Sequence, residues 1–201
     1  MYKFESVIKS LNKIASPNKY KKIFNQFSKK IKEGKTYQIK ICTKYKNKSL
    51  IDPVTLFWKL MKTNAAPESF MIRDKNFSIV SCSPETLIEK KGSKIITKPI
   101  AGTLRKTHKT NIRKALFYFK NNIKETKEHN MIVDMERSDL SKICKPGTVN
   151  LSKIKYVEEY KHLYHYVTKI EGKVKKNVNK KDIIKAMMPG GSVIGCPKIS
   201  T

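Results

Sequence analysis

The sequence contains no apolar stretch that is long enough to cross a membrane. No run approaches the roughly 20 consecutive apolar residues that a spanning helix needs. The first ten residues, MYKFESVIKS, also lack the apolar centre of a secretory signal. The four cysteines, at positions 42, 82, 144 and 196, lie too far apart for a zinc knuckle or a disulfide framework. We therefore expect a soluble, cytoplasmic protein with reduced thiols and no membrane partner.

Arginine and acidic residues are both scarce. Four arginines (Arg73, Arg105, Arg113 and Arg137) stand among 44 basic residues, against 16 acidic ones, and the formal net charge is +28. Arginine makes the bidentate contacts to phosphates and bases, whereas these lysines are spread over every segment. No RNA-binding aromatic signature or helix-turn-helix pattern accompanies them. We expect a solvated lysine surface with no specific nucleic-acid partner, although a basic nucleic-acid-binding module remains an alternative from another functional class.

Apolar residues at helical spacing predict several helices, and 201 residues suit one continuous core. The first helix covers residues 20–31 and ends at Gly34, and a second opens at Pro53 and runs through Met61. Residues 108–142 are helical, and Lys145-Pro146-Gly147 ends them. A last short helix is expected to be capped by Asp182 and to end before Pro189.

Alternating and β-branched segments predict strands between these helices. They are Thr36–Tyr45, four short runs between Ser69 and Lys98 with turns at 74–76 and 91–93, and Tyr164–Val174. The four short runs in succession are typical of an antiparallel meander. No internal repeat or linker interrupts the chain. The mixture predicts an α+β fold with much antiparallel sheet.

Five motifs follow one another in a fixed order. They are Ser83-Pro84-Glu85, Pro99–Thr103, Glu128–Asp139, Tyr160–His165 and Pro189–Lys198. Taken singly each is weak, because glycine pairs usually serve turns and helical glutamates are usually solvated. In this order and spacing they resemble the catalytic domain of chorismate-utilising enzymes, specifically component I of anthranilate synthase or aminodeoxychorismate synthase.

The resemblance runs from about Tyr20 to the last residue, so residues 1–19 are expected to be a lead-in and residues 20–201 a partial catalytic domain. It implies the chorismate-binding fold, an α+β arrangement of antiparallel sheets layered between helices. The family's domain continues beyond Thr201, where a second metal carboxylate would lie. We therefore expect a fold that is incomplete at its C-terminus, and a chain that alone has no synthase activity. An inactive remnant is a further alternative.

The resemblance also implies roles for individual residues. Chorismate is a dianion whose ring carboxylate must be held while a nucleophile adds at C2 and the C4 hydroxyl departs, which requires a hard cation and a proton donor. Glu128 would be a Mg²⁺ ligand, and Glu85 would be the general acid that protonates the leaving hydroxyl. Gly102 would bring a backbone N–H to the substrate, Thr103 would bring a hydroxyl, and His165 would lie beside the ring.

Some of these residues also have a structural explanation, and others should lie close together in space. His165 could instead be a satisfied histidine on a sheet. Gly195 and Lys198 resemble residues of the pocket wall, although a structural glycine turn explains them equally well. If the roles hold, Glu85 and Glu128 should face a common pocket with Thr103, with their carboxyl groups within about a dozen ångströms.

Two positions separate the reactions of the family. Isochorismate and salicylate synthases carry a lysine that activates water, and Gln38 stands at the matching position, in the catalytic centre, where an amide cannot act as that base. Aminodeoxychorismate synthases typically carry a lysine nucleophile where this chain has Ala101. Ala101 favours anthranilate synthase, a lyase of tryptophan biosynthesis in which ammonia from a glutamine amidotransferase subunit attacks chorismate and pyruvate is eliminated.

Other positions favour the folate-pathway enzyme or depart from the family pattern. Ala66-Pro67-Glu68-Ser69 and Gly102-Thr103-Leu104 look more like aminodeoxychorismate synthase. That enzyme stays the alternative, although position 101 touches the chemistry and these positions do not. Ser138, Ile194 and Cys196 replace the family's asparagine, threonine and alanine, which puts full activity in question.

Overall fold

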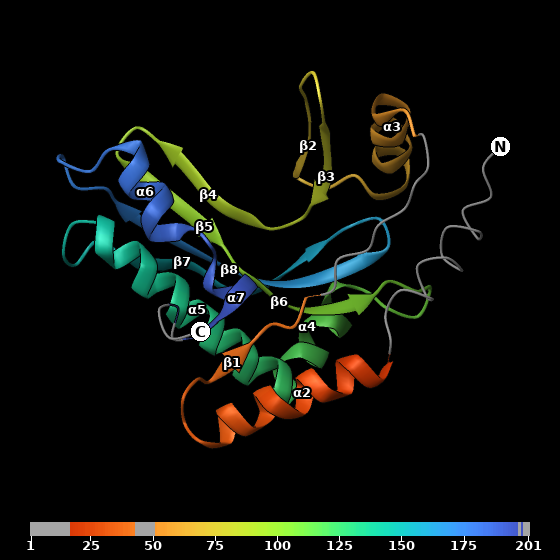
Figure 1. Ribbon diagram of the computed structural model, residues 1–201, viewed down its shortest axis with the longest axis horizontal. Coiled ribbons are helices and arrows are strands. Elements are labelled where there is room, and N and C mark those ends of the chain that lie inside the picture. The colour runs from red at the N-terminus through yellow and green to blue at the C-terminus, as the bar shows by residue number, and fades with distance from the viewer. Residues whose placement is uncertain (1–16, 43–50, 197, 199–201) are drawn as a thin grey trace. The chain divides into compact units, whose positions relative to one another are not determined.

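The computed structural model describes residues 17–42, 51–196 and 198 (Figure 1). The chain divides into two units, a larger one of residues 52–192 and a smaller one made of residues 1–51 and 193–201. In the described part of the chain, no helix has both the length and the apolar content that crossing a bilayer would require. The expected boundary between a lead-in and a catalytic domain near residue 19 stays a prediction, because residues 1–16 lie outside the described ranges.

The described part of the smaller unit contains a helix and one pair of short strands. Helix α2 (Pro17–Lys32) confirms the helix expected at 20–31, and the chain leaves it at Gly34, whose φ is +70°. Strand β1 (Gln38–Ile39) pairs antiparallel with β9 (Gly195–Cys196). The strand expected at 36–45 is therefore two residues long as far as Cys42, and residues 43–45 lie outside the described ranges.

The larger unit is built on a five-stranded antiparallel sheet. Its strands are β4 (Thr86–Lys91), β5 (Lys94–Lys98), β6 (Ile100–Arg105), β7 (Asn150–Glu159) and β8 (Leu163–Lys173). Strand β8 pairs with β6 through its first half and with β5 through its second half. Along its other edge β8 pairs with β7 over nearly its whole length. Strands β6 and β7 are not expected from the sequence.

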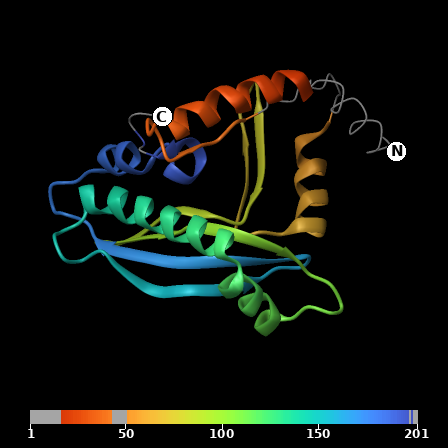
Figure 2. The ribbon, with the colours of Figure 1, turned by 90° about the horizontal axis from the view of Figure 1, so that it is seen from below.

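A separate hairpin of β2 (Glu68–Arg73) and β3 (Ser78–Ser83) precedes this sheet and projects from it (Figure 2). Helix α3 (Pro53–Asn64) packs against the hairpin. The side chain of Asp52 caps α3 by accepting a hydrogen bond from Thr55 N at 2.7 Å. The helix that opens at Pro53 and the strands expected between Ser69 and Lys98 are thus confirmed.

Two helices, α4 (Ile112–Asn121) and α5 (Ile123–Ile143), occupy the region where one helical stretch is expected. Asn122 divides them, because its N–H closes the last turn of α4 while its side chain accepts a hydrogen bond from Glu125 N at 3.2 Å. Helix α5 runs along the sheet (Figures 1 and 2). Helix α6 (Lys180–Met187) packs on α5, and the short α7 (Gly191–Ile194) follows it.

The expectation that Asp182 caps the last helix is wrong. The N-cap of α6 is Asn179, whose side chain accepts a hydrogen bond from Asp182 N at 3.1 Å. The Asp182 carboxylate returns a bond by accepting from Asn179 N at 3.0 Å. Asp182 is therefore the third residue of a capping box, in which cap and carboxylate satisfy each other's backbone N–H groups.

The core lies between the sheet and the helices α4, α5 and α6. Residues alternate between the two faces of β8, so Tyr164, Tyr166, Thr168 and Ile170 share one face. The ring of Phe119 in α4 stacks on that of Tyr166 with centroids 4.9 Å apart. The largest cluster joins α5 and α6 to the sheet through Ile95, Val133, Leu140, Ile143, Ile170, Ile183 and Met187. The other face of β8 carries His165 and Val167.

Candidate functional site

A hydrogen-bonded pair, Thr103 and His165, occupies neighbouring strands of the sheet. Thr103 of β6 lies directly opposite His165 of β8 in the strand register. A hydrogen bond joins Thr103 Oγ1 to His165 Nδ1 at 3.0 Å. His165 is buried while Thr103 is exposed. The hydrogen bond therefore joins a buried ring to a side chain at the protein surface. The sequence predicts both residues in one site, and the sheet register brings them together.

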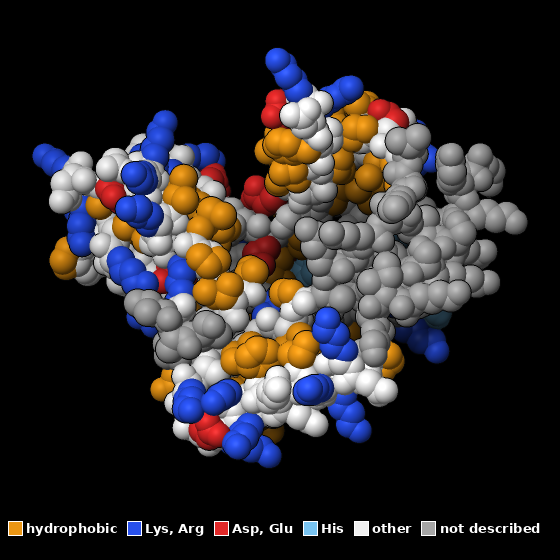
Figure 3. Space-filling view, in the orientation of Figure 1, with side chains coloured by type: hydrophobic (Ala, Val, Ile, Leu, Met, Phe, Trp, Pro, Cys, Tyr) orange, Lys and Arg blue, Asp and Glu red, His pale blue; other side chains and the backbone are white. Residues whose placement is uncertain are grey.

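Glu85 reaches the start of the same strand from the connection between β3 and β4. Its Oε1 accepts a hydrogen bond from Ile100 N at 3.1 Å, and its own N–H donates to Ser83 Oγ at 3.3 Å. Because Ile100 is the first residue of β6, the Glu85 carboxylate is held two residues before Gly102 in that strand. Figure 3 shows a hollow between the β2–β3 hairpin and the end of the sheet that carries β4, with acidic side chains inside it.

Gly102 occupies a position that only glycine fits. Its φ is +109°, and an added Cβ would lie 2.9 Å from Phe119 Cε1 and 3.1 Å from Glu125 Oε2. A register shift between Ile100 and Thr103 accompanies this conformation, which is typical of a β-bulge. The glycine thus lets the backbone of β6 approach α4 and α5 closely.

Glu125 is a candidate residue that the sequence analysis missed. Its carboxylate lies against Gly102, as the 3.1 Å clearance to Oε2 shows. It precedes Glu128 by three residues in α5, so the two carboxylates share one face of the helix. The Glu-x-x-Glu spacing was the available signal. Among the described residues no group of three or more His, Cys, Asp and Glu side chains could hold a metal ion. Helix α5 offers two carboxylates, those of Glu125 and of half-buried Glu128.

His129, next to Glu128, joins α5 to three strands. It is fully buried. Its Nδ1 lies 3.2 Å from the carbonyl oxygen of Ala101, which can only accept, so Nδ1 donates. Its Nε2 then accepts from Thr168 Oγ1 at 2.7 Å, and that oxygen accepts from Lys155 N at 3.0 Å. Burial lowers the pKa of His129. These hydrogen bonds fix Ala101 directly before the β-bulge at Gly102.

The environment of His165 contains opposing electrostatic influences. Burial lowers its pKa, while the carbonyl of Gly102 and the charge of Glu158 act in the other direction. Glu158 of β7 lies opposite His165 in the register. It accepts hydrogen bonds from Tyr156 and Tyr160, and burial, followed by Glu158, raises the pKa of both tyrosines. Sequence reasoning also missed Glu158, although the alternation Tyr-x-Glu-x-Tyr places all three side chains on one face of a strand.

The remaining candidates, Gln38, Gly195 and Lys198, belong to the smaller unit. Gln38 pairs with Cys196, and its Oε1 is buried with no hydrogen-bond partner among the described residues. Gly195 has a φ of +144° in β9, and Lys198 is half-buried. The expected site residues therefore form two sets, these three in the smaller unit and the rest in the larger unit, around β6 and α5. The common pocket of Glu85 and Glu128 stays a prediction.

Comparisons with known proteins find related sequences over most of this chain. A family model described as chorismate binding enzyme matches residues 2–201. Anthranilate synthase component 1 of Saccharolobus solfataricus is 34% identical over 190 residues, which cover 94% of this chain and 44% of that protein. Aminodeoxychorismate synthase component 1 of Bacillus subtilis is 33% identical over 187 residues, which cover 89% and 39%. The chain thus spans about two fifths of the length of these relatives.

Solved structures confirm the expected fold class. The crystal structure of anthranilate synthase component I from Streptococcus pneumoniae superposes with a TM-score of 0.82 at 26% identity, over 92% of this chain and 41% of that one. A putative isochorismate synthase, DhbC from Bacillus anthracis, superposes with a TM-score of 0.66 at 22% identity, which shows likeness of fold alone. Helices and antiparallel sheets are arranged here as in the matching part of anthranilate synthase component I.

Proposed function

Because this chain belongs to the chorismate binding enzyme family, we propose that it is part of the catalytic half of an anthranilate synthase component I. The observation that carries the proposal is the convergence of separate motifs on β6. Glu85 bonds to Ile100, Glu125 and His129 reach Gly102 and Ala101 from α5, and Thr103 pairs with His165. A structural role alone does not require polar groups from three other segments to meet at one strand.

The proposed chemistry follows from the residue types. Glu125 and Glu128 would hold Mg²⁺, since a pair of carboxylates with substrate oxygens and water suits that ion. When bound, the ion would neutralise the ring carboxylate of chorismate. Glu85 would give a proton to the departing C4 hydroxyl. Thr103 and the backbone of Gly102 would bind the substrate, and His165 would orient its ring.

The choice of product rests on Ala101. No amine is available at this buried position for attack on the ring, so free ammonia, delivered by a glutamine amidotransferase subunit, would be the nucleophile. Aminodeoxychorismate synthase remains the second candidate because of Ala66–Ser69. This segment is ordered at the start of β2, where Glu68 Oε1 accepts from Thr86 Oγ1 at 2.5 Å.

Chorismate binding can be tested on the 201-residue chain by NMR, which detects weak complexes. We expect chorismate with Mg²⁺ to shift the backbone signals of Gly102 and Thr103, without turnover. Glu128→Gln should abolish the response to Mg²⁺. Glu89→Gln is the matched control, because Glu89 pairs only with exposed Lys91 in the described part of the chain. Shifts that are equal in both variants, or confined to other strands, would reject the proposed site.

Mass spectrometry distinguishes the two candidate nucleophiles. In a version extended at its C-terminus to the length of its relatives and quenched during turnover of chorismate with Mg²⁺, the segment around Ala101 should keep its unmodified mass, because alanine cannot form a covalent adduct. A ring adduct on the peptide containing Pro99–Arg105 would instead support the aminodeoxychorismate reaction. Binding of polyanions without any response to chorismate would favour the nucleic-acid alternative.

A further inference from the structure

Three polar side chains form a row across β6, β8 and β7. Thr103 and Glu158 lie on either side of His165, each directly opposite it in the register of its own strand pair. Directly opposed residues of antiparallel strands have Cβ atoms roughly 4.5–5.5 Å apart and project from the same face. His165 therefore lies between a hydroxyl group and a carboxylate.

Glu158 is held in place by two neutral donors. Tyr156 Oη donates to its Oε1 at 2.9 Å and Tyr160 Oη donates to its Oε2 at 2.8 Å. Both carboxylate oxygens thus accept a hydrogen bond from an uncharged phenol. In the described part of the chain no lysine or arginine forms an ion pair with Glu158. A lysine does contact one of its two hydrogen-bond donors, because Lys153 Nζ lies 3.8 Å from the centroid of the Tyr156 ring.

His165 is enclosed by these groups. The Tyr160 ring meets the imidazole edge to face, with centroids 5.2 Å apart and planes inclined by 68°. Thr103 Oγ1 lies 3.0 Å from Nδ1 of His165, and only 6% of His165 is exposed. The groups that face the ring are therefore Thr103 from β6, Glu158 from β7 and Tyr160 directly after β7, while the charge of Glu68 in β2 acts on Tyr160.

We infer that Glu158, fixed by Tyr156 and Tyr160, is a positioning residue that stabilises the protonated form of the His165 ring. Burial disfavours a charged imidazole, and a fixed carboxylate across the strand pair offsets that cost. Proton uptake forms an N–H bond on the His165 ring and breaks an O–H bond of a bound ligand or of water, and return of the proton reverses both changes. This role for His165 rests on the proposed function, whereas the coupling between the two side chains does not.

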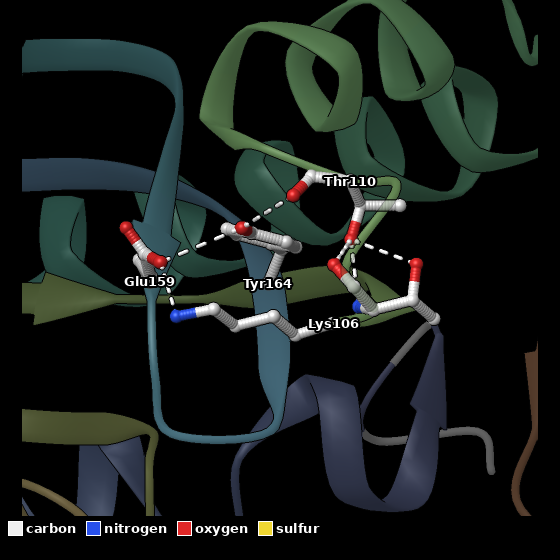
Figure 4. Close-up of polar contacts among 5 residues, drawn as sticks. Lys106, Thr110, Glu159 and Tyr164 are labelled. Atoms are coloured by element: carbon white, nitrogen blue, oxygen red, sulfur yellow. Dashed lines mark hydrogen bonds and ion pairs between the residues drawn. The ribbon is translucent and has the colours of Figure 1, made fainter.

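The next residue in β7 provides a matched control. Glu159 projects from the opposite face, where its Oε1 lies 2.5 Å from Lys106 Nζ and accepts from Tyr164 Oη at 3.4 Å (Figure 4). The single hydroxyl proton of Tyr164 is shared between this carboxylate and the carbonyl oxygen of Thr110, which is also 3.4 Å away. Glu158 and Glu159 thus carry the same charge on the same strand, and only Glu158 faces His165.

The test is an NMR titration of the His165 ring in the full chain. We expect Glu158→Gln to lower the pKa of His165 by about one unit, a tenfold change in proton affinity, and Glu159→Gln to leave it unchanged. The double variant Tyr156→Phe with Tyr160→Phe keeps the carboxylate and should produce a smaller fall. That variant provides the test if Glu158→Gln does not fold.

The possible outcomes separate the inference from the proposed function. Equal pKa values of His165 in the Glu158→Gln and Glu159→Gln variants would overturn the inference, whatever the chain binds. A specific fall in the Glu158 variant, without any effect of chorismate on Gly102 or Thr103 in the unaltered chain, would support the coupling and reject the proposed function. If chorismate binds, its pH dependence should shift to lower pH in the Glu158 variant only.

Discussion

Gly102 combines a backbone conformation that side chains rarely adopt with a lack of space. Its φ is +109°, and a Cβ would come within 2.9 Å of the fully buried Phe119 ring. We expect Gly102→Ala to lower the free energy of unfolding by about 2–4 kcal/mol, because strain and overpacking add. Urea denaturation measures this loss.

A second glycine serves as the control for Gly102. Gly92, in the turn between β4 and β5, also has a positive φ, +58°, but a Cβ added there would meet no atom within 4 Å. Gly92→Ala should therefore cost only about 1 kcal/mol, from the backbone alone. Equal losses in the two variants would show that the contacts of Gly102 with α4 and α5 do not matter.

The buried His129 should make stability depend on pH. Burial lowers its pKa in the folded chain below the ordinary value of 6.5, so the unfolded chain binds the proton first. The free energy of unfolding is then constant above about pH 7.5 and falls as the pH drops through 6.5, by at most about 1.4 kcal/mol per pH unit for each such histidine. The shift of His165 acts in the same direction.

Denaturation curves between pH 5 and pH 8, recorded with a chelator present, would measure this dependence. His129→Gln should be less stable at pH 8 because one of the two hydrogen bonds is lost, yet its stability should change less with pH. A slope between pH 5 and pH 7 identical to that of the unaltered chain would show that His129 does not cause it.

At the scale of the element, helix α4 is attached to the sheet mainly through one aromatic side chain, Phe119. Phe119 is fully buried against Tyr166, while Phe117, two residues earlier, is 70% exposed. Phe119→Ala should lower the free energy of unfolding by about 3–5 kcal/mol, because it leaves a cavity and removes the ring stack. Thermal or urea denaturation would measure the change.

The exposed Phe117 is a control on the same helix. Phe117→Ala should change stability by no more than about 0.5 kcal/mol. A comparable loss in both variants would mean that α4 is stabilised by more than its contact with the sheet.

The strands differ in how far their sequences predict them. Strand β8 alternates clearly, and the strand expected at 164–174 is found at 163–173. Strand β6 follows β5 directly after Pro99, and its glycine bulge breaks the alternation, so local pattern does not indicate a strand. Strand β7 contains two register shifts, and Lys155 there has a φ of +48°. Both strands pair with β8, which lies far from β6 in the sequence, and such pairing cannot be predicted from a local sequence pattern.

At the scale of the whole molecule, the dominant feature is the net charge of +28. Like charges repel more strongly in the folded chain, so NaCl should raise the melting temperature by screening them. Lys176, Lys180 and Lys181 are exposed at or near the positive N-terminal end of α6. Replacing these three with glutamine should raise the melting temperature at low salt and weaken its dependence on NaCl. Scanning calorimetry at several salt concentrations checks both effects, and an unchanged salt dependence would contradict the argument.

The sequence by itself determined the family, the α+β class and most of the helices and strands, because motif order, apolar spacing and turn residues are local properties of the chain. It also predicted that Glu85, Thr103 and His165 belong to one site, and the fold places Thr103 beside His165. Only the tertiary structure brought Glu125 against Gly102 and Glu158 opposite His165, and made Asn179 rather than Asp182 the cap of α6. The first two depend on strand register and helix packing between residues far apart in sequence. The third depends on where the helix is stabilised by the core, through Ile183 and Met187.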